Sequence, residues 1–145
     1  MRRFWIVAIA IAMCAGSASA DNDRPITFEQ LPKGAQTLIK KHFADATIQL
    51  AKEDPGILGS EYDVVFSDGT KVEFNDRGQW ESIKCRNKAL PAAVVPQPIA
   101  DYVKKHYPTA FITSIDRDAR DYEVELNTGV ELTFNMQFHC IDIDY

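Results

Sequence analysis

His139 and Cys140 are neighbours near the end of the sequence, and a cysteine activated by a histidine is a common enzyme nucleophile. Such a pair works only when the imidazole lies within hydrogen-bonding distance of the thiol. This segment predicts a strand, in which neighbouring side chains point to opposite faces. The sequence also has no G-x-S-x-G, H-E-x-x-H, C-x-x-C or phosphate-loop motif. We therefore predict no catalytic residues and a protein that is not an enzyme.

The other two histidines occur in a repeated motif, KKHF at 40–43 and KKHY at 104–107. A metal would need further ligands at helical spacing beside His42 or His106. Both residues come in the last turn of a predicted helix, where a polar or cationic tip complements the helix dipole. We interpret them as packed histidines and expect no metal and no cofactor.

Asp116, Asp118 and Asp121 surround Arg117 and have some likeness to a calcium-binding loop. The rest of the EF-hand pattern is missing from the segment. We interpret it as a solvated turn.

The two KKH motifs belong to a longer internal match. Residues 31–48 align with 95–112 at an offset of 64, with six identities in 18 positions. Further on, EYDVVFSDGTKVEFN (61–75) aligns with DYEVELNTGVELTFN (121–135) at an offset of 60. The change of offset places four extra residues in the loop between Asp54 and Ser60, where insertions cost little. We infer two repeats, 21–86 and 87–145.

Each repeat predicts one helix followed by strands. Ala35, Leu38, Ile39 and His42 lie on one helical face, and Ile99, Tyr102, Val103 and His106 repeat the pattern. Alternating residues from Tyr62 and from Tyr122 predict strands, followed by hairpin turns at Gly69 and Gly129. Further strands are expected from Thr47, Thr113, Trp80 and Cys140.

These elements predict an α+β fold. We expect a tandem repeat of a helix plus a four-stranded antiparallel sheet, with the helices on one face and the other face open. One unit of this size has a marginal core. The two units therefore either continue one sheet or pack side by side, joined by a proline-rich connection at 85–98 that packs on them.

The open face is the candidate binding surface. Alternation places these residues on it: Trp80, Asp63, Val65, Glu73, Glu123, Glu125, Glu131 and Asp142. Trp80 aligns with Cys140, which predicts an outward tryptophan among charges, the composition of an interface anchor. The alternative is a tryptophan partly covered by the connection or by the other repeat.

The first twenty residues predict a secretory signal. Two arginines precede an apolar stretch, and Ala18-Ser19-Ala20 precede Asp21, so cleavage is expected after Ala20. Lipidation of Cys14 is the alternative. Without Arg2 and Arg3 the formal charge changes from −5 to −7. We expect a periplasmic or secreted protein with no membrane span after cleavage, and no nucleic-acid partner because an acidic protein repels phosphate.

The mature chain has two cysteines, Cys85 and Cys140, and a secretory signal predicts that it reaches an oxidising compartment. They are not equivalent by repeat, because Cys140 aligns with Trp80. A disulfide requires Cα atoms within about 7 Å, which holds only if the fourth strands of the two repeats adjoin. The sequence favours two separate cysteines and leaves pairing open.

Four stretches carry a family resemblance: ITFEQLPKGAQTLIKKHF (26–43), GTKVEFNDRGQWESIKC (69–85), LPAAVVPQPIADYVKKHYP (90–108) and YEVELNTGVELTFN (122–135). Through them, residues 26–145 resemble the PepSY-like, beta-lactamase-inhibitor-like family of secreted bacterial proteins. The chain departs from the family pattern at Met136, Gln137 and Phe138, where an acidic residue and glycine are usual. The resemblance implies a beta-lactamase-inhibitor-like fold and an inhibitory role in the periplasm, with no established target.

We therefore predict a non-enzymatic periplasmic or secreted binding module. It would bind an unknown protein partner through the open sheet face and its hairpin tips, and such binding could inhibit that partner. The alternative is an envelope sensor for a small ligand or cation, suggested by the acidic residues of the second repeat.

Overall fold

A computed structural model of the chain describes residues 22–145. The predicted signal segment, its cleavage site after Ala20 and Cys14 lie outside the described residues. Within 22–145, no helix has both the length and the apolar character needed to cross a membrane.

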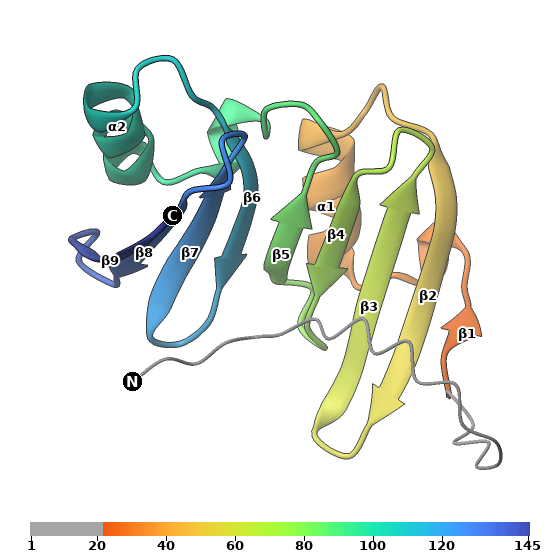
Figure 1. Cartoon of the computed structure of the whole chain (residues 1–145). Coiled ribbons are helices and arrows are strands. Elements are labelled where there is room, and N and C mark those ends of the chain that lie inside the picture. Colours follow the sequence, from red (N-terminus) through yellow and green to blue (C-terminus); the bar gives the residue numbers. More distant parts are fainter. Residues whose placement is uncertain (1–21) are drawn as a thin grey trace, which may run out of the picture.

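The described chain forms nine strands and two α-helices (Figure 1). Both predicted helices are confirmed, as α1 (Lys33–His42) and α2 (Gln97–His106). Short 3-10 turns precede them, η1 (Phe28–Gln30) and η2 (Ala92–Val94). The strands are β1 (Arg24–Pro25), β2 (Ile48–Gly56), β3 (Gly59–Phe66), β4 (Lys71–Phe74), β5 (Trp80–Lys84), β6 (Ile112–Arg117), β7 (Asp121–Leu126), β8 (Glu131–Asn135) and β9 (Cys140–Asp144).

All nine strands form one antiparallel sheet in the order β1 to β9 (Figure 1). The predicted fold class, a tandem repeat of a helix plus a four-stranded sheet, is therefore wrong. β5 pairs directly with β6, with Ile83 opposite Ile115, so the sheet does not divide between residues 86 and 87. The physical reason is backbone hydrogen bonding, because two separate sheets would leave β5 and β6 as unpaired edges. β1 was not predicted.

One face of this sheet carries the core. An apolar row crosses the strands from β2 to β9: Ala51, Val64, Val72, Ile83, Ile115, Val124, Leu132 and Ile143. The six residues from Val64 to Leu132 have 0% of their surface exposed. Complete burial of each such side chain stabilises the fold by about 1.5–3 kcal/mol.

Both helices pack on the core side of the sheet. Ala35 and Ile39 of α1 are buried, and Phe43 at its end stacks on Phe66 with ring centroids 5.2 Å apart. In α2, Tyr102 meets Phe134 edge-on, also at 5.2 Å. Phe66 and Phe134 each lie two residues along a strand from a member of the buried row, hence on the same face. No helix of residues 22–145 covers the opposite, open face.

The connection between β5 and α2 packs on the sheet, as predicted. The backbone N–H of Cys85 donates to Thr113 at 2.8 Å, and that of Leu90 donates to Ile112 at 3.0 Å. Leu90, Val94 and Val95 are buried. These contacts hold the start of β6 against the end of β5.

Candidate functional site

The open face consists of two rows of mainly polar side chains that cross eight strands. Residues directly opposite each other on paired strands share a face of the sheet. The first row is Lys52, Asp63, Glu73, Ser82, Asp116, Glu123, Thr133 and Asp142, and the second is Leu50, Val65, Lys71, Lys84, Ser114, Glu125, Glu131 and Asp144.

The strand pairing brings most of the predicted site residues onto this face. They are Asp63, Val65, Glu73, Glu123, Glu125, Glu131 and Asp142. The sequence reasoning missed Asp116 and Asp144. It assigned Asp116 to a turn, whereas β6 continues to Arg117 and places Asp116 between Ser82 and Glu123. The signal in the sequence is the apolar Ile115 beside it. Ile115 belongs to the core side of β6, and alternation then places Asp116 on the open face.

The predicted outward position of Trp80 is wrong, because only 8% of its surface is exposed. The β4–β5 pairing shifts by one residue, so that Phe74 is opposite Trp80 while Glu73 is opposite Ser82. Phe74 is a core residue, and Trp80 therefore lies on the core side with it. The guanidinium carbon of Arg117 lies 4.0 Å from the indole centroid and covers the ring.

The part of the open face on β2–β5 is neutralised by ion pairs. Asp63 lies 3.6 Å from the Lys52 ammonium and 3.1 Å from that of Lys71. Lys71 also pairs with Glu73 at 2.5 Å, and Lys52 pairs with Asp23. Asp63 is directly opposite Glu73, and Lys71 is directly opposite Lys84. Lys71 pairs with both of these carboxylates, so the charges on this part of the face are balanced.

The part on β6–β9 is different, because it collects carboxylates. We name as the acidic half-face the residues Asp116, Glu123, Glu125, Glu131, Asp142 and Asp144. Among residues 22–145, Lys84 is the one cation in an ion pair with this group, 3.6 Å from Glu125. The remaining carboxylates of the group form no ion pair within the described chain.

Several of these carboxylates stand directly opposite one another. Asp116 is opposite Glu123, and Glu131 has Glu125 opposite on one side and Asp144 on the other. Directly opposed like charges destabilise a sheet. The acidic half-face is therefore a local cost to folding that a cationic ligand or surface would relieve.

The pKa values of two members reflect this crowding. Partial burial among the strands raises the pKa of Glu123, and the neighbouring Glu131 and Asp116 raise it further. The Asp116 side chain is exposed, yet the surrounding strands desolvate its carboxylate in part and raise its pKa. A hydrogen bond with Ser82 and the charge of Lys84 offset part of this rise, whereas Glu73 and Glu125 add to it. A positive group on this surface would lower both pKa values.

The histidines and cysteines lie elsewhere. His42 and His106 end the two helices on the core side of the sheet, and the His106 ring lies 4.3 Å from that of Tyr102. Cys85 is buried and Cys140 half-buried, and both are free thiols. Within 22–145, no three His, Cys, Asp or Glu side chains are arranged to hold a metal ion.

The β2–β3 hairpin ends in two fully exposed aliphatic residues. Ile57 and Leu58 have relative exposures of 104% and 98%. The hairpin extends beyond the neighbouring strands (Figure 1), because β2 and β3 are longer than β4. An exposed aliphatic pair at a protruding tip is a second candidate for contact with a partner.

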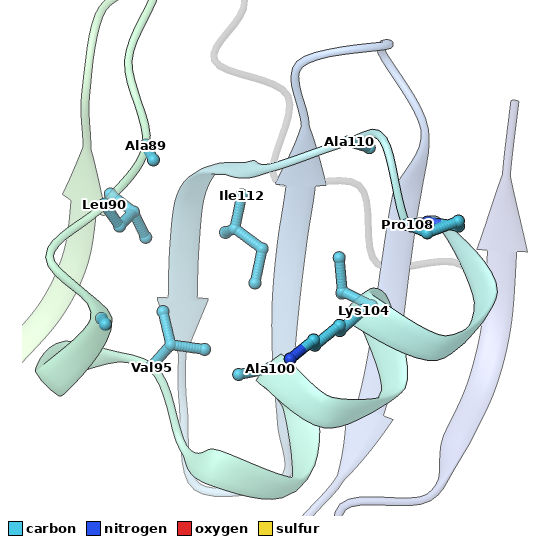
Figure 2. Close-up of a pocket in the computed structure, with 10 residues that line it drawn as sticks. Ala89, Leu90, Val95, Ala100, Lys104, Pro108, Ala110 and Ile112 are labelled. Carbon is cyan, nitrogen blue, oxygen red and sulfur yellow. The ribbon is translucent and has the colours of Figure 1, made fainter.

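An apolar cavity of about 200 Å³ lies between α2, the connection and the start of β6 (Figure 2). Leu90, Val95, Ala100 and Ile112 line it, and Lys104 extends beside Ala100. Lys104 is its single ionisable side chain, so the cavity offers no pair of groups for acid–base chemistry. It lies on the helix side of the sheet, away from the acidic half-face.

Solved structures of similar sequence share this fold. A putative periplasmic protein of the DUF2874 family from Bacteroides vulgatus is 47% identical, with a TM-score of 0.83, over 87% of this chain and 99% of that chain. A putative calcium-regulated periplasmic protein from Bacteroides thetaiotaomicron is 44% identical, with a TM-score of 0.84, over the same shares. A putative periplasmic protein of unknown function from Bacteroides vulgatus is 30% identical, with a TM-score of 0.80, over 85% and 99%.

No curated protein matches the sequence significantly. A known family does match it over residues 60–142, from β3 to β9, and that family is described as "Putative beta-lactamase-inhibitor-like, PepSY-like". The matched region includes every residue of the acidic half-face except Asp144. The chain belongs to this PepSY-like, beta-lactamase-inhibitor-like family.

Proposed function

We propose that this protein is a non-enzymatic binding module of the periplasm or the secreted space, and that its acidic half-face holds a positively charged surface of a protein partner. The observation that carries the proposal is the set of opposed carboxylates: Asp116 with Glu123, and Glu131 with Glu125 and Asp144. Their repulsion weakens the fold, whereas a Lys- or Arg-rich partner would turn it into attraction.

The family and its solved relatives support the setting. The relatives are described as periplasmic, and the family name refers to inhibitors. If the partner is an enzyme, occupation of its surface would act as inhibition. The exposed Ile57–Leu58 tip would supply an apolar anchor beside the electrostatic contact.

The proposal is tested by photo-crosslinking in periplasmic extract of the source bacterium. A benzophenone amino acid replaces Thr133, at the centre of the acidic half-face, or the exposed Lys105 on α2. We expect a protein adduct from position 133 that is absent from position 105. The double variant Glu123→Gln/Glu131→Gln should form no adduct at position 133. Added salt should also abolish the adduct of the parent protein, because it screens the charges.

The matched control is Asp45→Asn/Asp101→Asn, which removes the same charge from exposed positions outside the sheet. It should retain the adduct. Identical adducts from both crosslinking positions, or an adduct indifferent to the acidic half-face, would contradict the proposal.

A second candidate function is an envelope sensor for a cation. It is favoured by the 44% identical relative described as calcium-regulated and by the raised pKa values of Glu123 and Asp116. Calorimetry with calcium chloride tests it. Heat of binding that disappears in Glu123→Gln/Glu131→Gln would support this function, and no heat at millimolar calcium would remove it.

A further inference from the structure

The two edges of the sheet differ in how they are protected. At one edge, β1 has only two residues, one of which is Pro25, and an Arg24–Glu53 ion pair of 2.7 Å ties it to β2. Short strands and proline are devices that prevent an edge from pairing with another chain. At the other edge, β9 has five residues and no proline or lysine. Within residues 22–145, no strand pairs with its outer side.

The backbone of β9 has an N–H group at this edge that no neighbouring strand of the described chain accepts. The N–H of Ile143 donates to the Asp142 carboxylate of its own strand, at 3.1 Å. In the sheet interior, such a group donates to a neighbouring strand. The carboxylate is thus a local substitute that an incoming carbonyl could replace.

The register determines what an added strand would meet. Asp142 and Asp144 end the two rows of the open face, and Ile143 ends the apolar row on the core side. Side chains alternate between faces along a strand. A tenth strand would therefore place every second side chain against the carboxylates and the intervening ones against Ile143.

We infer that β9 takes up an extended segment of the partner protein as a tenth strand, and that this segment alternates Lys or Arg with apolar residues. The inference rests on the proposed function and specifies the partner's chemistry. Backbone hydrogen bonds to the free edge supply affinity, and the alternate side chains supply selectivity.

A second copy of this chain is a poorer occupant of the same edge. β9 reads Cys140-Ile141-Asp142-Ile143-Asp144 and contains no positive charge. Pairing two β9 strands with their open faces aligned would set Asp142 and Asp144 against the same residues of the other copy. Directly opposed like charges are unfavourable, and here they would extend rows that are already acidic.

The test uses three synthetic peptides and fluorescence anisotropy with the whole protein. The first is KVKVKVK, the second has the same sequence with N-methyl groups on alternate backbone amides, and the third is the block sequence KKKKVVV. All three carry the same charge. We expect the first to bind at least tenfold more tightly than the others, and hydrogen exchange at the Ile143 amide to slow when it binds.

Asp142→Asn/Asp144→Asn should lower the affinity for the first peptide by up to about tenfold. The variant removes the two opposite-charge pairs with peptide lysines, and each pair contributes less than a tenfold change in affinity. Asp45→Asn/Asp101→Asn, with the same change in charge, should leave binding unchanged. Equal binding of all three peptides would overturn the inference that the partner segment adds to β9 as a tenth strand. Loss of that binding in Glu123→Gln/Glu131→Gln would then show that the acidic half-face acts through charge alone.

Absence of binding by every peptide overturns this inference, and the crosslinking experiment at Thr133 judges the proposed function separately. A dimer in sedimentation that KVKVKVK does not dissociate, with β9 amides already protected, would assign the edge to a second copy and also overturn the inference.

Discussion

Arg117 on β6 lies over Trp80 on β5, with its guanidinium carbon 4.0 Å from the indole centroid and its Nε donating to the Trp80 carbonyl at 2.7 Å. One side chain thus makes a cation–π contact and a charged hydrogen bond to the same residue. The pair links the two strands at the middle of the sheet, just beyond Ser82 and Asp116, the last residues at which β5 pairs with β6.

Replacing Arg117 with alanine should lower the free energy of unfolding by about 1–3 kcal/mol, because both contacts are lost. Trp80 is the only tryptophan of residues 22–145, so its emission should shift to longer wavelength as water reaches the ring. Urea denaturation of Arg117→Ala, with the exposed Arg120→Ala as control, measures both effects. Equal stability of the two variants would contradict the assigned contact.

Gly78 should tolerate no side chain, for two separable reasons. Its φ of +74° is unfavourable for L-residues, and an added Cβ would lie 2.8 Å from Pro32 Cβ and 3.0 Å from Ala35 N. Gly129 has φ of +90° with no atom within 4 Å of an added Cβ. Gly129→Ala should cost about 1–2 kcal/mol through backbone strain alone, and Gly78→Ala about 2–3 kcal/mol more through overpacking. Thermal unfolding compares them, and equal costs would contradict the close approach of α1 to this turn.

Glu131→Gln should stabilise the protein while weakening partner binding. It removes repulsion from both Glu125 and Asp144, which is worth roughly 0.5–1 kcal/mol. The matched control is Glu73→Gln on the neutralised part of the face, where the loss of the Lys71 ion pair should be neutral or slightly destabilising. Denaturation curves give the sign for each variant. A destabilised Glu131→Gln would show that its carboxylate has a stabilising partner.

Glu123 should make stability depend on pH in the opposite direction to Asp68. The folded pKa of Glu123 is raised, so its favourable contribution is present below its unfolded pKa and is lost as pH rises through the folded value. Lys88 and the Thr70 amide lower the pKa of Asp68 to about 2, so that contribution is present at neutral pH and lost on acidification.

Glu123→Gln should therefore be more stable than the parent protein at pH 7, and this gain should vanish near pH 4. Asp68→Asn should be less stable at pH 7, with the deficit shrinking toward pH 2. Urea titrations measure the free energy of unfolding of Glu123→Gln at pH 7 and pH 4, and of Asp68→Asn at pH 7 and pH 2, each against the parent protein. A Glu123→Gln gain that does not change with pH would attribute the effect to packing rather than charge.

The helices and most strands could be predicted because their apolar periodicities are regular. The Ala35–Ile39 spacing predicts α1, and the alternation around Val64 and Val124 predicts β3 and β7. The joining of β5 to β6 could not be predicted, because Ile83 and Ile115 show the same alternation whether their strands lie at an edge or inside a sheet.

The wrong face for Trp80 has a specific cause. The alignment with Cys140 and strict alternation place it outward, but the register shift between Glu73 and Phe74 returns it to the core side. Phe138 is comparable. It occupies a left-handed turn with φ of +62°, where glycine is usual, and its ring lies 5.5 Å from that of Tyr122. Neither a one-residue bulge nor an aromatic contact across a turn leaves a periodic signal.

The unbroken order β1 to β9 also determines how the chain can fold. Six of the strand pairings are between strands joined by a short turn, and such hairpins form locally and early. β1–β2 and β5–β6 are the exceptions, because α1 and α2 lie between their strands. Docking of β6 on β5 must therefore wait until the segment from Cys85 to Phe111 has closed into a loop. That closure, which unites Ile83 with Ile115, and the similar closure of β1 on β2 are the two steps of sheet formation that cost the most loop entropy.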